Sequence, residues 1–301
     1  MMGTLIKEID SKFSYAIIRG QYGNGKSNLI KYLKYYFEQH TECNVTVANW
    51  RADVDRYDII TFLLYIIQNE FSDISLTSLK EMVANSNASS FCDGYNGSFA
   101  AIKSYVNKIE ENVESEEDIK TLISLGTGKV YDSNSFKHYG LTKLSDYNRR
   151  EVLVFFLNAL AGSKHYILFC MDELEKIQEK SRARFQSFLT TFRELIDLSS
   201  IIKGHMIIAA ITDSVSDEHS FDSYNQAFER RIKDYKFELT AIRSFDEIRI
   251  MAEKLVRILG ESYRKESYDD IANIVYKNTS KYLHTADVVR AVFAQLTADE
   301  D

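Results

Sequence analysis

The chain contains no proline among its 301 residues, although an average usage near 5% would give about 15. Proline-rich linkers and polyproline ligands are therefore excluded, and helices can run unbroken. Cysteine is scarce as well, because Cys43, Cys92 and Cys170 are the only three and never stand at metal-ligand spacing. We expect neither a disulfide framework nor a zinc ribbon, and we expect Cys43 and Cys170 to be buried thiols in a reducing compartment.

Long hydrophobic runs are also missing. No stretch approaches 18 apolar residues, and the beginning of the chain, MMGTLIKEIDSKF, contains acids and no apolar run of signal-peptide length. We therefore expect a cytoplasmic protein that has no membrane partner. The formal net charge of −7 gives no overall electrostatic case for nucleic acid, although a local basic groove can be hidden in that average. With 45% hydrophobic and 13% aromatic residues, the chain can bury a large core.

Short apolar runs typical of buried strands alternate with segments of helical periodicity. Strands are expected at 15–19, 43–48, 165–171, 205–211 and 235–239, and helices at 28–40, 58–71, 100–113 and 185–196. This alternation predicts an α/β protein in which helices flank a parallel sheet. After residue 240 only helical stripes remain, so we expect a small all-helical domain at 241–301.

A glycine-rich stretch stands between the first expected strand and the helix after it. Its letters, GQYGNGKS, match the pattern G-x-x-x-x-G-K-[ST] at every position. Glycines there let successive backbone N–H groups turn toward a β-phosphate, Lys26 reaches the β- and γ-oxygens, and the Ser27 hydroxyl is a ligand for Mg²⁺. The stretch therefore predicts a site for ATP with Mg²⁺. The candidate nucleotide-binding residues are Gly20, Gly23, Asn24, Gly25, Lys26, Ser27 and Asn28.

Two adjacent acids, Asp172 and Glu173, end the apolar run that begins at Tyr166. A carboxylate at the carboxyl end of such a strand lies near the phosphate loop, where Asp172 can hold Mg²⁺ together with Ser27. Glu173 can then polarise the attacking water as a catalytic base. A strand followed by an acidic helix start gives the same letters, but beside a phosphate loop we interpret the pair as catalytic.

The chain between these two motifs is longer than a simple core requires. From Lys26 to Asp172 there are 172 − 26 = 146 residues, whereas two helices, one strand and four loops need about 50. We therefore expect a mostly helical insertion at about 73–148 within a core that spans 1–240. We expect this insertion to contact a partner or DNA and to take no part in the nucleotide site.

Polar groups follow the last two expected strands of the core as well. Thr212, at the end of the 205–211 strand, is either a helix cap or a group that orients the water or senses the γ-phosphate, and we favour the second role. Arg230 and Arg231 precede the last strand. They are either a solvated helix end or charges that complete a neighbour's active site, and we favour the neighbour's site.

These features in this order resemble the AAA+ ATPases over residues 15–240, with a helical lid beyond. The resemblance implies a P-loop NTPase sheet with the phosphate-loop strand in the centre, the acidic strand beside the Thr212 strand, and a lid that closes over ATP. The family's lid arginine falls at Val289 in one alignment, and Arg290 stands one position later. Arg290 is therefore the candidate γ-phosphate sensor of the lid.

A second, narrower resemblance rests on the letters DELEKI at 172–177, on Arg184 and Phe185, and on RELID at 193–197. These residues are similar to the ATP-binding proteins of BREX-type phage-defence systems, which stand near the origin-recognition and transposition-regulator ATPases. The resemblance implies a role in antiviral defence.

We therefore predict an ATPase that converts ATP and water to ADP and phosphate, assembles with ATP into a homo-oligomeric ring or filament, and acts on DNA or partner proteins. An ATP-gated scaffold that does not hydrolyse ATP is an alternative, against which the intact Glu173 argues. A small-molecule kinase is another, but it would need an acceptor pocket. The candidate DNA-facing residues, on helix faces where basic residues are usually only solvated, are Arg182, Arg184, Arg230, Arg231 and Lys233.

Overall fold

The computed structural model describes residues 9, 12–40, 44–52, 58–70, 76–81, 100–128, 132–141, 146–212, 226–260, 267–282 and 284–297. Cys43 and Cys92 lie outside these residues. Cys170 is buried, as expected, and burial raises the pKa of its thiol to about 12.

One sheet of five strands forms the centre of the protein, and all of its strand pairs are parallel. The strands stand in the order β2-β3-β4-β1-β5, so the predicted α/β fold with a parallel sheet is confirmed. The acidic strand β3 pairs with β4, as the resemblance implies, but β4 and not the glycine-loop strand β1 takes the middle position. The strands are β1 (Ser14–Gly20), β2 (Val45–Arg51), β3 (Tyr166–Asp172), β4 (Met206–Thr212) and β5 (Lys236–Glu238).

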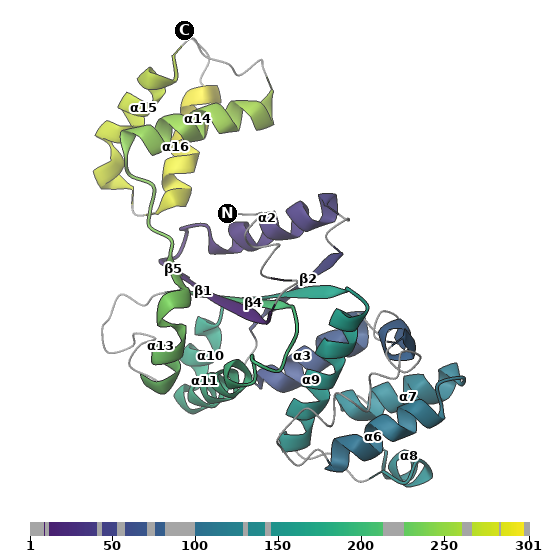
Figure 1. The fold of residues 1–301 in the computed structure, drawn as a ribbon. Helices are drawn as coiled ribbons and strands as arrows, with labels where there is room; N and C mark the ends of the chain where they lie inside the picture. Colours follow the sequence, from purple (N-terminus) through teal and green to yellow (C-terminus); the bar gives the residue numbers. More distant parts are fainter. Residues whose placement is uncertain are drawn as a thin grey trace.

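Alternate residues of each central strand point to opposite faces of the sheet, and both faces are covered. On β1, Ile17 packs into a large hydrophobic cluster on one face, whereas Ala16 and Ile18 pack into a smaller cluster with α2 (Lys26–Gln39) on the other. In Figure 1, α2 lies on one side of the sheet and most other core helices lie on the opposite side. Those helices are α3 (Ile59–Glu70), α9 (Asp146–Gly162), α10 (Glu175–Lys180), α11 (Arg182–Asp197) and α13 (Gln226–Ile232).

Three more helices lie in the segment expected to be an insertion, namely α6 (Ala100–Glu111), α7 (Glu116–Thr127) and α8 (Ser133–His138). They extend away from the sheet in Figure 1. Ile102 of α6 and Leu122 of α7 are nevertheless fully buried in the same hydrophobic cluster as α3 and α9. The helices of this segment therefore share their core with the helices that cover the sheet.

The C-terminal helices α14 (Phe245–Leu259), α15 (Tyr268–Lys277) and α16 (Thr285–Thr297) enclose a hydrophobic cluster of their own. Ser244 and Glu247 begin α14 with a capping box, in which the Ser244 hydroxyl accepts from the Glu247 N–H and the Glu247 carboxylate accepts from the Ser244 N–H. We call these three helices the lid. Among the described helices, none is both long and apolar enough to cross a membrane.

Candidate functional site

The glycine-rich loop connects the carboxyl end of β1 to the first turn of α2. Gly25 stands just before α2 with φ 93°, in the left-handed region that glycine tolerates best. The Lys26 side chain is buried, and its Nζ donates to the carbonyl oxygens of Gly20 at 2.8 Å and Gln21 at 3.1 Å. The loop thus folds around the lysine ammonium, and Ser27 is the second residue of the helix, directly after Lys26.

The two acids lie where the sequence predicts, at the carboxyl end of β3. Asp172 is buried, and its Oδ1 accepts from the Glu173 N–H at 2.9 Å. Glu173 has φ 61°, a left-handed conformation that costs a residue with a side chain roughly 1–3 kcal/mol. Its carboxylate contacts two cations, Arg51 Nη2 at 3.6 Å and Lys176 Nζ at 2.5 Å. The tight turn and these contacts fix the carboxylate at the sheet edge.

Thr212, at the end of β4, is bonded to a third acid. Its hydroxyl donates to Glu175 Oε1 at 2.6 Å and its backbone N–H donates to Oε2 of the same carboxylate at 3.1 Å. Glu175 is the first residue of α10, directly after the turn that holds Glu173. The end of β4 is thereby joined to the helix that follows the acid pair.

The register of the sheet brings these groups to one edge. Gly20 pairs with Thr212 across β1 and β4, and Met171 pairs with Ala209 across β3 and β4. If the register between β3 and β4 is continued beyond Met171 and Ala209, Glu173 lies opposite Ile211, one residue before Thr212. Because neighbouring strands are about 4.8 Å apart, the glycine loop and the acid pair are separated by about 10 Å across β4. The glycine loop, the acids and Thr212 therefore share one carboxyl edge.

The lid contacts the glycine loop at the start of α16. The Ala286 N–H donates to the Gly23 carbonyl at 3.2 Å, and the His284 and Tyr22 rings meet edge to face with centroids 6.2 Å apart. A Cβ added at Gly23 would stand 2.8 Å from the His284 Cβ. A glycine is thus required where lid and loop touch.

A hollow of about 490 Å³ opens beside the same loop. Gln21 and Asn24 line it on the loop side, and residues 238–241 with Arg243, which lead from β5 into the lid, line the other. The Asn24 side-chain amide donates to the Leu239 carbonyl at 2.9 Å and ties the two walls together. The hollow therefore lies between the glycine loop and the segment that carries the lid.

The predicted arginine pair lies at the opposite end of the sheet. The Tyr15 hydroxyl, at the beginning of β1, donates to the Arg231 carbonyl at 3.0 Å, so the end of α13 lies beside the start of that strand. The Arg231 guanidinium forms a bidentate pair with Asp197, from Nε to Oδ1 at 2.5 Å and from Nη2 to Oδ2 at 3.2 Å. Arg230 is exposed. The two arginines thus differ in their surroundings, because only Arg231 is paired with another residue that the structure describes.

The lid arginine is exposed to solvent. Arg290 is 80% exposed at its side chain and pairs with Asp287 of its own helix at 3.4 Å. Asn28, the last of the predicted nucleotide-binding residues, is exposed on the first turn of α2. His284 and Ala286, at the start of α16, contact the glycine loop. The role of Arg290 as a γ-phosphate sensor stays a prediction.

The predicted DNA-facing residues lie near the two ends of α11. Arg182 and Arg184 lie in the first turn of α11, whereas Arg231 is bound to Asp197, the last residue of that helix. With a rise of 1.5 Å per residue, the two ends are about 20 Å apart. A DNA-facing surface that includes all of these residues would therefore extend along the whole length of α11, and this role stays a prediction.

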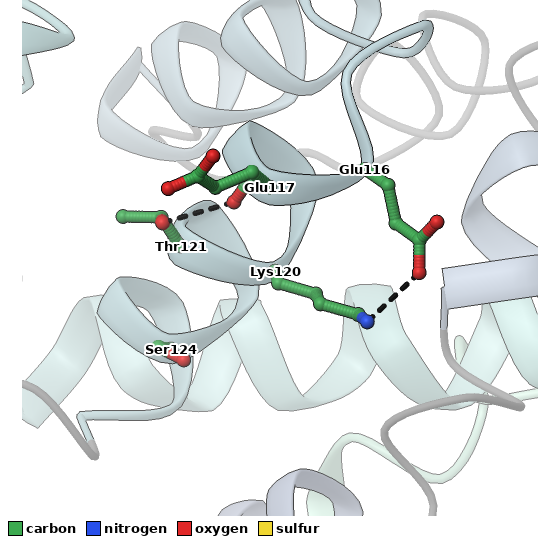
Figure 2. A pocket seen from close by; sticks show the side chains of 5 residues that line it. All are labelled: Glu116, Glu117, Lys120, Thr121 and Ser124. Atoms are coloured by element: carbon green, nitrogen blue, oxygen red, sulfur yellow. Dashed lines mark hydrogen bonds and ion pairs between the residues drawn. The ribbon is translucent and has the colours of Figure 1, made fainter.

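Figure 2 shows a second hollow, along α7 in the segment expected to be an insertion. Its side chains bond to one another along the helix, with Glu116 paired to Lys120 at 2.8 Å and the Thr121 hydroxyl donating to the Glu117 carbonyl at 2.9 Å. None of the predicted site residues lines it. This hollow therefore lies on the surface of α7, apart from the site.

Sequence reasoning missed several residues that the structure brings to the site. Glu175 stands in the letters DELEKI, and its position two residues after Glu173 was the only signal for it. Lys176, which pairs with the Glu173 carboxylate, stands in the same letters. Arg51, which also contacts that carboxylate, and His284, which stands beside Gly23, had no such signal. The contacts of Arg51 and His284 join segments far apart in the sequence, so only the folded chain reveals them.

No family model and no curated protein sequence matches the chain. Among solved structures, the chain is similar to the Aeropyrum pernix ORC1 protein in complex with DNA, at 12% identity and a TM-score of 0.43, over 98% of this chain and 57% of that one. It is also similar to the Aeropyrum pernix ORC2 protein in its ADP form, at 13% identity and a TM-score of 0.42, over 98% of this chain and 58% of that one.

A further similar structure is the same ORC2 protein in ADPNP-ADP complexes, at 11% identity and a TM-score of 0.40, over 100% of this chain and 66% of that one. The chain thus spans less than two thirds of the length of each of these proteins. The DNA and the nucleotides belong to those proteins.

Proposed function

We propose that this protein is an ATPase of the AAA+ type, which hydrolyses ATP with Mg²⁺. One observation carries the proposal. The carboxyl ends of three adjacent strands bring together a glycine loop with a buried Lys26, a buried carboxylate at Asp172, and the bonded pair of Thr212 and Glu175. ATP hydrolysis requires this combination of hydrogen-bond donors to the phosphates, an acid, and a polar group at the end of the neighbouring strand.

The residues present fit both ligands. Loop N–H groups and the Lys26 ammonium would bind the phosphates of ATP, because the ammonium now bonded to loop carbonyls can turn to phosphate oxygens. Asp172 and Ser27 would hold Mg²⁺, which usually takes one or two carboxylates and keeps water and substrate phosphates as its other ligands. A bound Mg²⁺ supplies positive charge to the phosphate oxygens. The nucleoside would lie in the hollow beside Asn24.

Glu173 is the proposed catalytic base. Its strained backbone and its contacts with Arg51 and Lys176 hold the carboxylate at the edge where the γ-phosphate would lie. Arg51 and Lys176 would orient it, and Thr212, which is oriented by Glu175, would orient the water. Each role needs a fixed side chain, and each of these side chains has a bonded partner.

The test compares Glu173→Gln with a matched control, Glu179→Gln, which changes an exposed glutamate of the same helical region. Glu173→Gln should keep ATP binding and lose about 10²- to 10⁴-fold in phosphate release, the usual contribution of a general base. The control should keep both. Phosphate release without any added acceptor also separates hydrolysis from a kinase. Normal turnover by Glu173→Gln would remove the assignment, and no turnover in the wild type would favour an ATP-gated scaffold.

We further propose that neighbouring subunits share the active site. Arg231 lies beside Tyr15, five residues before Gly20 along β1, which corresponds to about 17 Å. The arginines of α13 are thus far from the chain's own glycine loop, and Arg230 can reach a neighbour packed head to tail. Such contacts close into rings or wind into filaments, so ATP should promote oligomers.

Mixing Glu173→Gln subunits with Arg230→Ala subunits tests this proposal. An interface that joins an intact glutamate to an intact arginine should regain activity, because an arginine supplied by a neighbour contributes about 10³- to 10⁵-fold in rate. Activity should appear only on mixing, with size-exclusion chromatography confirming co-assembly. A co-assembled mixture as inactive as its components would contradict a shared site.

We propose that the ATP cycle acts on DNA or on partner proteins in the cytoplasm, in an antiviral defence system. This last part rests on the sequence resemblance at 172–197. The same proposal includes the division of the chain into a core at 1–240 and a lid at 241–301. It also includes a partner-contacting role for the segment at 73–148. Stimulation of phosphate release by duplex DNA is the first measurement to make.

A further inference from the structure

Four exposed lysines stand at the amino edge of the sheet, opposite the glycine loop. Each lies two or three residues before a strand: Lys164 before β3, Lys203 before β4, Lys12 before β1 and Lys233 before β5. None of them forms an ion pair with another described residue. Because these four strands are consecutive neighbours in the sheet, the lysines follow one another in space in that order. We call them the lysine row.

The spacing of the row follows from the spacing of the strands. Neighbouring strands are about 4.8 Å apart, so the row extends over about 14 Å. The Ser14 N–H donates to the His205 carbonyl at 3.1 Å, which ties the loops before β1 and β4 together. Lys12 and Lys203 line one hollow of about 380 Å³, together with Ser199, Ser200 and the Tyr235 ring. The middle of the row is therefore a shallow site with ammonium and hydroxyl groups.

The charge at this edge is positive although the whole chain carries −7. Asp197 is taken up by the bidentate pair with Arg231, and Lys236 pairs with Glu229. Among the residues that the structure describes at this edge, Asp234, next to Lys233, is one acid against the four lysines of the row. Arg230 adds a further exposed cation on α13. A polyanion would therefore meet a net attraction here.

We propose that the lysine row binds the phosphodiester backbone of a nucleic acid, which rests on the DNA contact in the proposed function and names its surface. Each strand of a duplex presents a phosphate about every 3.4 Å along the axis, so about four phosphates face a 14 Å row. The Ser199 and Ser200 hydroxyls add donors for phosphate oxygens. Because these contacts are made with the backbone, binding is independent of base sequence.

A protein partner fits this edge less well. Protein interfaces are anchored by large apolar or aromatic side chains at their centre. At the lysine row the apolar side chains Phe13 and Ile202 are buried in the core of the protein itself, and Tyr235, 40% exposed, is the ring that remains accessible in the hollow. The accessible chemistry at the centre is thus cationic and hydroxylic, as phosphate recognition requires.

The experiment measures binding of a labelled 20-base-pair duplex between 50 and 200 mM salt. Four neutralised phosphates predict a slope of log affinity against log salt near −3.6, or about a 150-fold loss over this range. Lys12→Gln/Lys203→Gln should halve the slope and lose only about 12-fold. The control Lys31→Gln/Lys254→Gln removes the same charge from exposed lysines of α2 and α14 and should behave as the wild type. ATP hydrolysis by both double variants should equal that of the wild type.

The outcomes separate the two proposals. A duplex that binds the wild type with a slope unchanged in Lys12→Gln/Lys203→Gln, or equally reduced in the control, overturns the lysine row and leaves the ATPase intact. A protein that hydrolyses ATP but binds no nucleic acid overturns the row as well. Binding of anionic vesicles or polyglutamate in place of nucleic acid, with the same lysine dependence, overturns the choice of ligand. Single-stranded DNA, whose slope per phosphate is about 0.7 instead of 0.9, identifies which form is bound.

Discussion

The two edges of the sheet are built in different ways from the same five strands. At the carboxyl edge, the important residues are contiguous in sequence, with eight residues forming the glycine loop and Asp172 and Glu173 standing side by side. At the amino edge, single lysines arrive from four loops that are up to 221 residues apart, from Lys12 to Lys233. The residues of the carboxyl edge can therefore be recognised as a motif in the sequence. The lysines of the amino edge can be recognised only as a surface of the folded protein.

This difference reflects the chemistry proposed for each edge. A γ-phosphate needs several donors fixed within a few ångströms, which a continuous loop and a helix start provide. A nucleic-acid backbone is a row of equal charges, which single side chains from neighbouring strands can match. The two edges are joined by the length of β1, about 20 Å, so they can be tested independently.

The largest effect is expected from Lys26→Ala. The variant removes about two charge-assisted hydrogen bonds to phosphate, each worth about 1.5–3 kcal/mol, so ATP affinity should fall about 10²- to 10⁴-fold. Duplex binding without nucleotide should stay at the wild-type level, because the lysine row lies at the other edge. Calorimetry with ATP and anisotropy with duplex measure the two properties separately. Lys31→Ala on the same helix is the control, and a loss of ATP binding in both variants would indicate damage to α2.

The next effect concerns His205, which is fully buried between β3, β4 and α9. Its Nδ1 accepts from the Ile167 N–H at 3.0 Å and its Nε2 faces the Leu157 carbonyl at 2.7 Å, so the neutral ring donates through Nε2. Burial lowers its pKa to about 4 from 6.5. The unfolded chain therefore binds the proton first, and the free energy of unfolding should decrease by about 3 kcal/mol as the pH falls from 6.5 to 4.

Denaturant unfolding at pH 7, 6 and 5 measures this slope. His205→Gln should be less stable than the wild type at pH 7 but lose less stability on acidification, because the titrating group is gone. His138→Gln, at an exposed histidine, should keep the wild-type slope. A wild-type slope in His205→Gln would show that another group dominates the acid sensitivity.

A smaller effect is expected where the lid meets the glycine loop. Gly23→Ala adds a Cβ that would stand 2.8 Å from the His284 Cβ, at a backbone φ of 80°. The strain costs roughly 1–3 kcal/mol, so ATP affinity should fall about 10- to 100-fold. Gly140→Ala is the matched control, because Gly140 has φ 64° but open space around it. An equal effect of both variants on ATP affinity would exclude the lid contact as its cause.

The strands were well predicted because each is a short apolar run bounded by polar residues. The expected strand at 205–211 is β4 at Met206–Thr212, and the expected helix at 185–196 lies within α11. Helix α9 was not predicted from the sequence, and residues 149–162 were assigned to no helix or strand. Its residues from Val152 to Leu160 are buried on every side, so the helix has no amphipathic stripe that periodicity could detect.

The candidate site was predictable as far as it is contiguous. The glycine loop and the acid pair are local motifs, and the structure brings them to one edge with Thr212. The bond between Thr212 and Glu175 and the contact of His284 with Gly23 depend on tertiary structure, which the order of residues does not encode in any short pattern. The positions of the basic residues depend on tertiary structure as well, since Arg231 of α13 is bound to Asp197 at the end of α11 opposite to Arg182.

The smallest effect on stability is expected from Arg231→Ala at the amino edge. Arg231 and Asp197 form a bidentate pair, but their side chains are 39% and 45% exposed. Exposed pairs contribute about 0–1 kcal/mol because water and salt screen them. The variant should therefore lower the free energy of unfolding by no more than about 1 kcal/mol, and a double-mutant cycle with Asp197→Ala should recover most of that value.

Arg230→Ala is the variant to compare with Arg231→Ala, because the two together show which arginine acts in the neighbour's site. Arg230 is exposed next to Arg231, so its loss should leave stability unchanged and lower ATP hydrolysis in the assembled protein. If Arg231 serves the neighbour's site instead, its pair with Asp197 must open on assembly, and Arg231→Ala would reduce hydrolysis far more than stability. Asp197→Ala decides between the two, because it frees Arg231. Faster hydrolysis by Asp197→Ala would assign the shared role to Arg231, whereas an unchanged rate together with an inactive Arg230→Ala assigns it to Arg230.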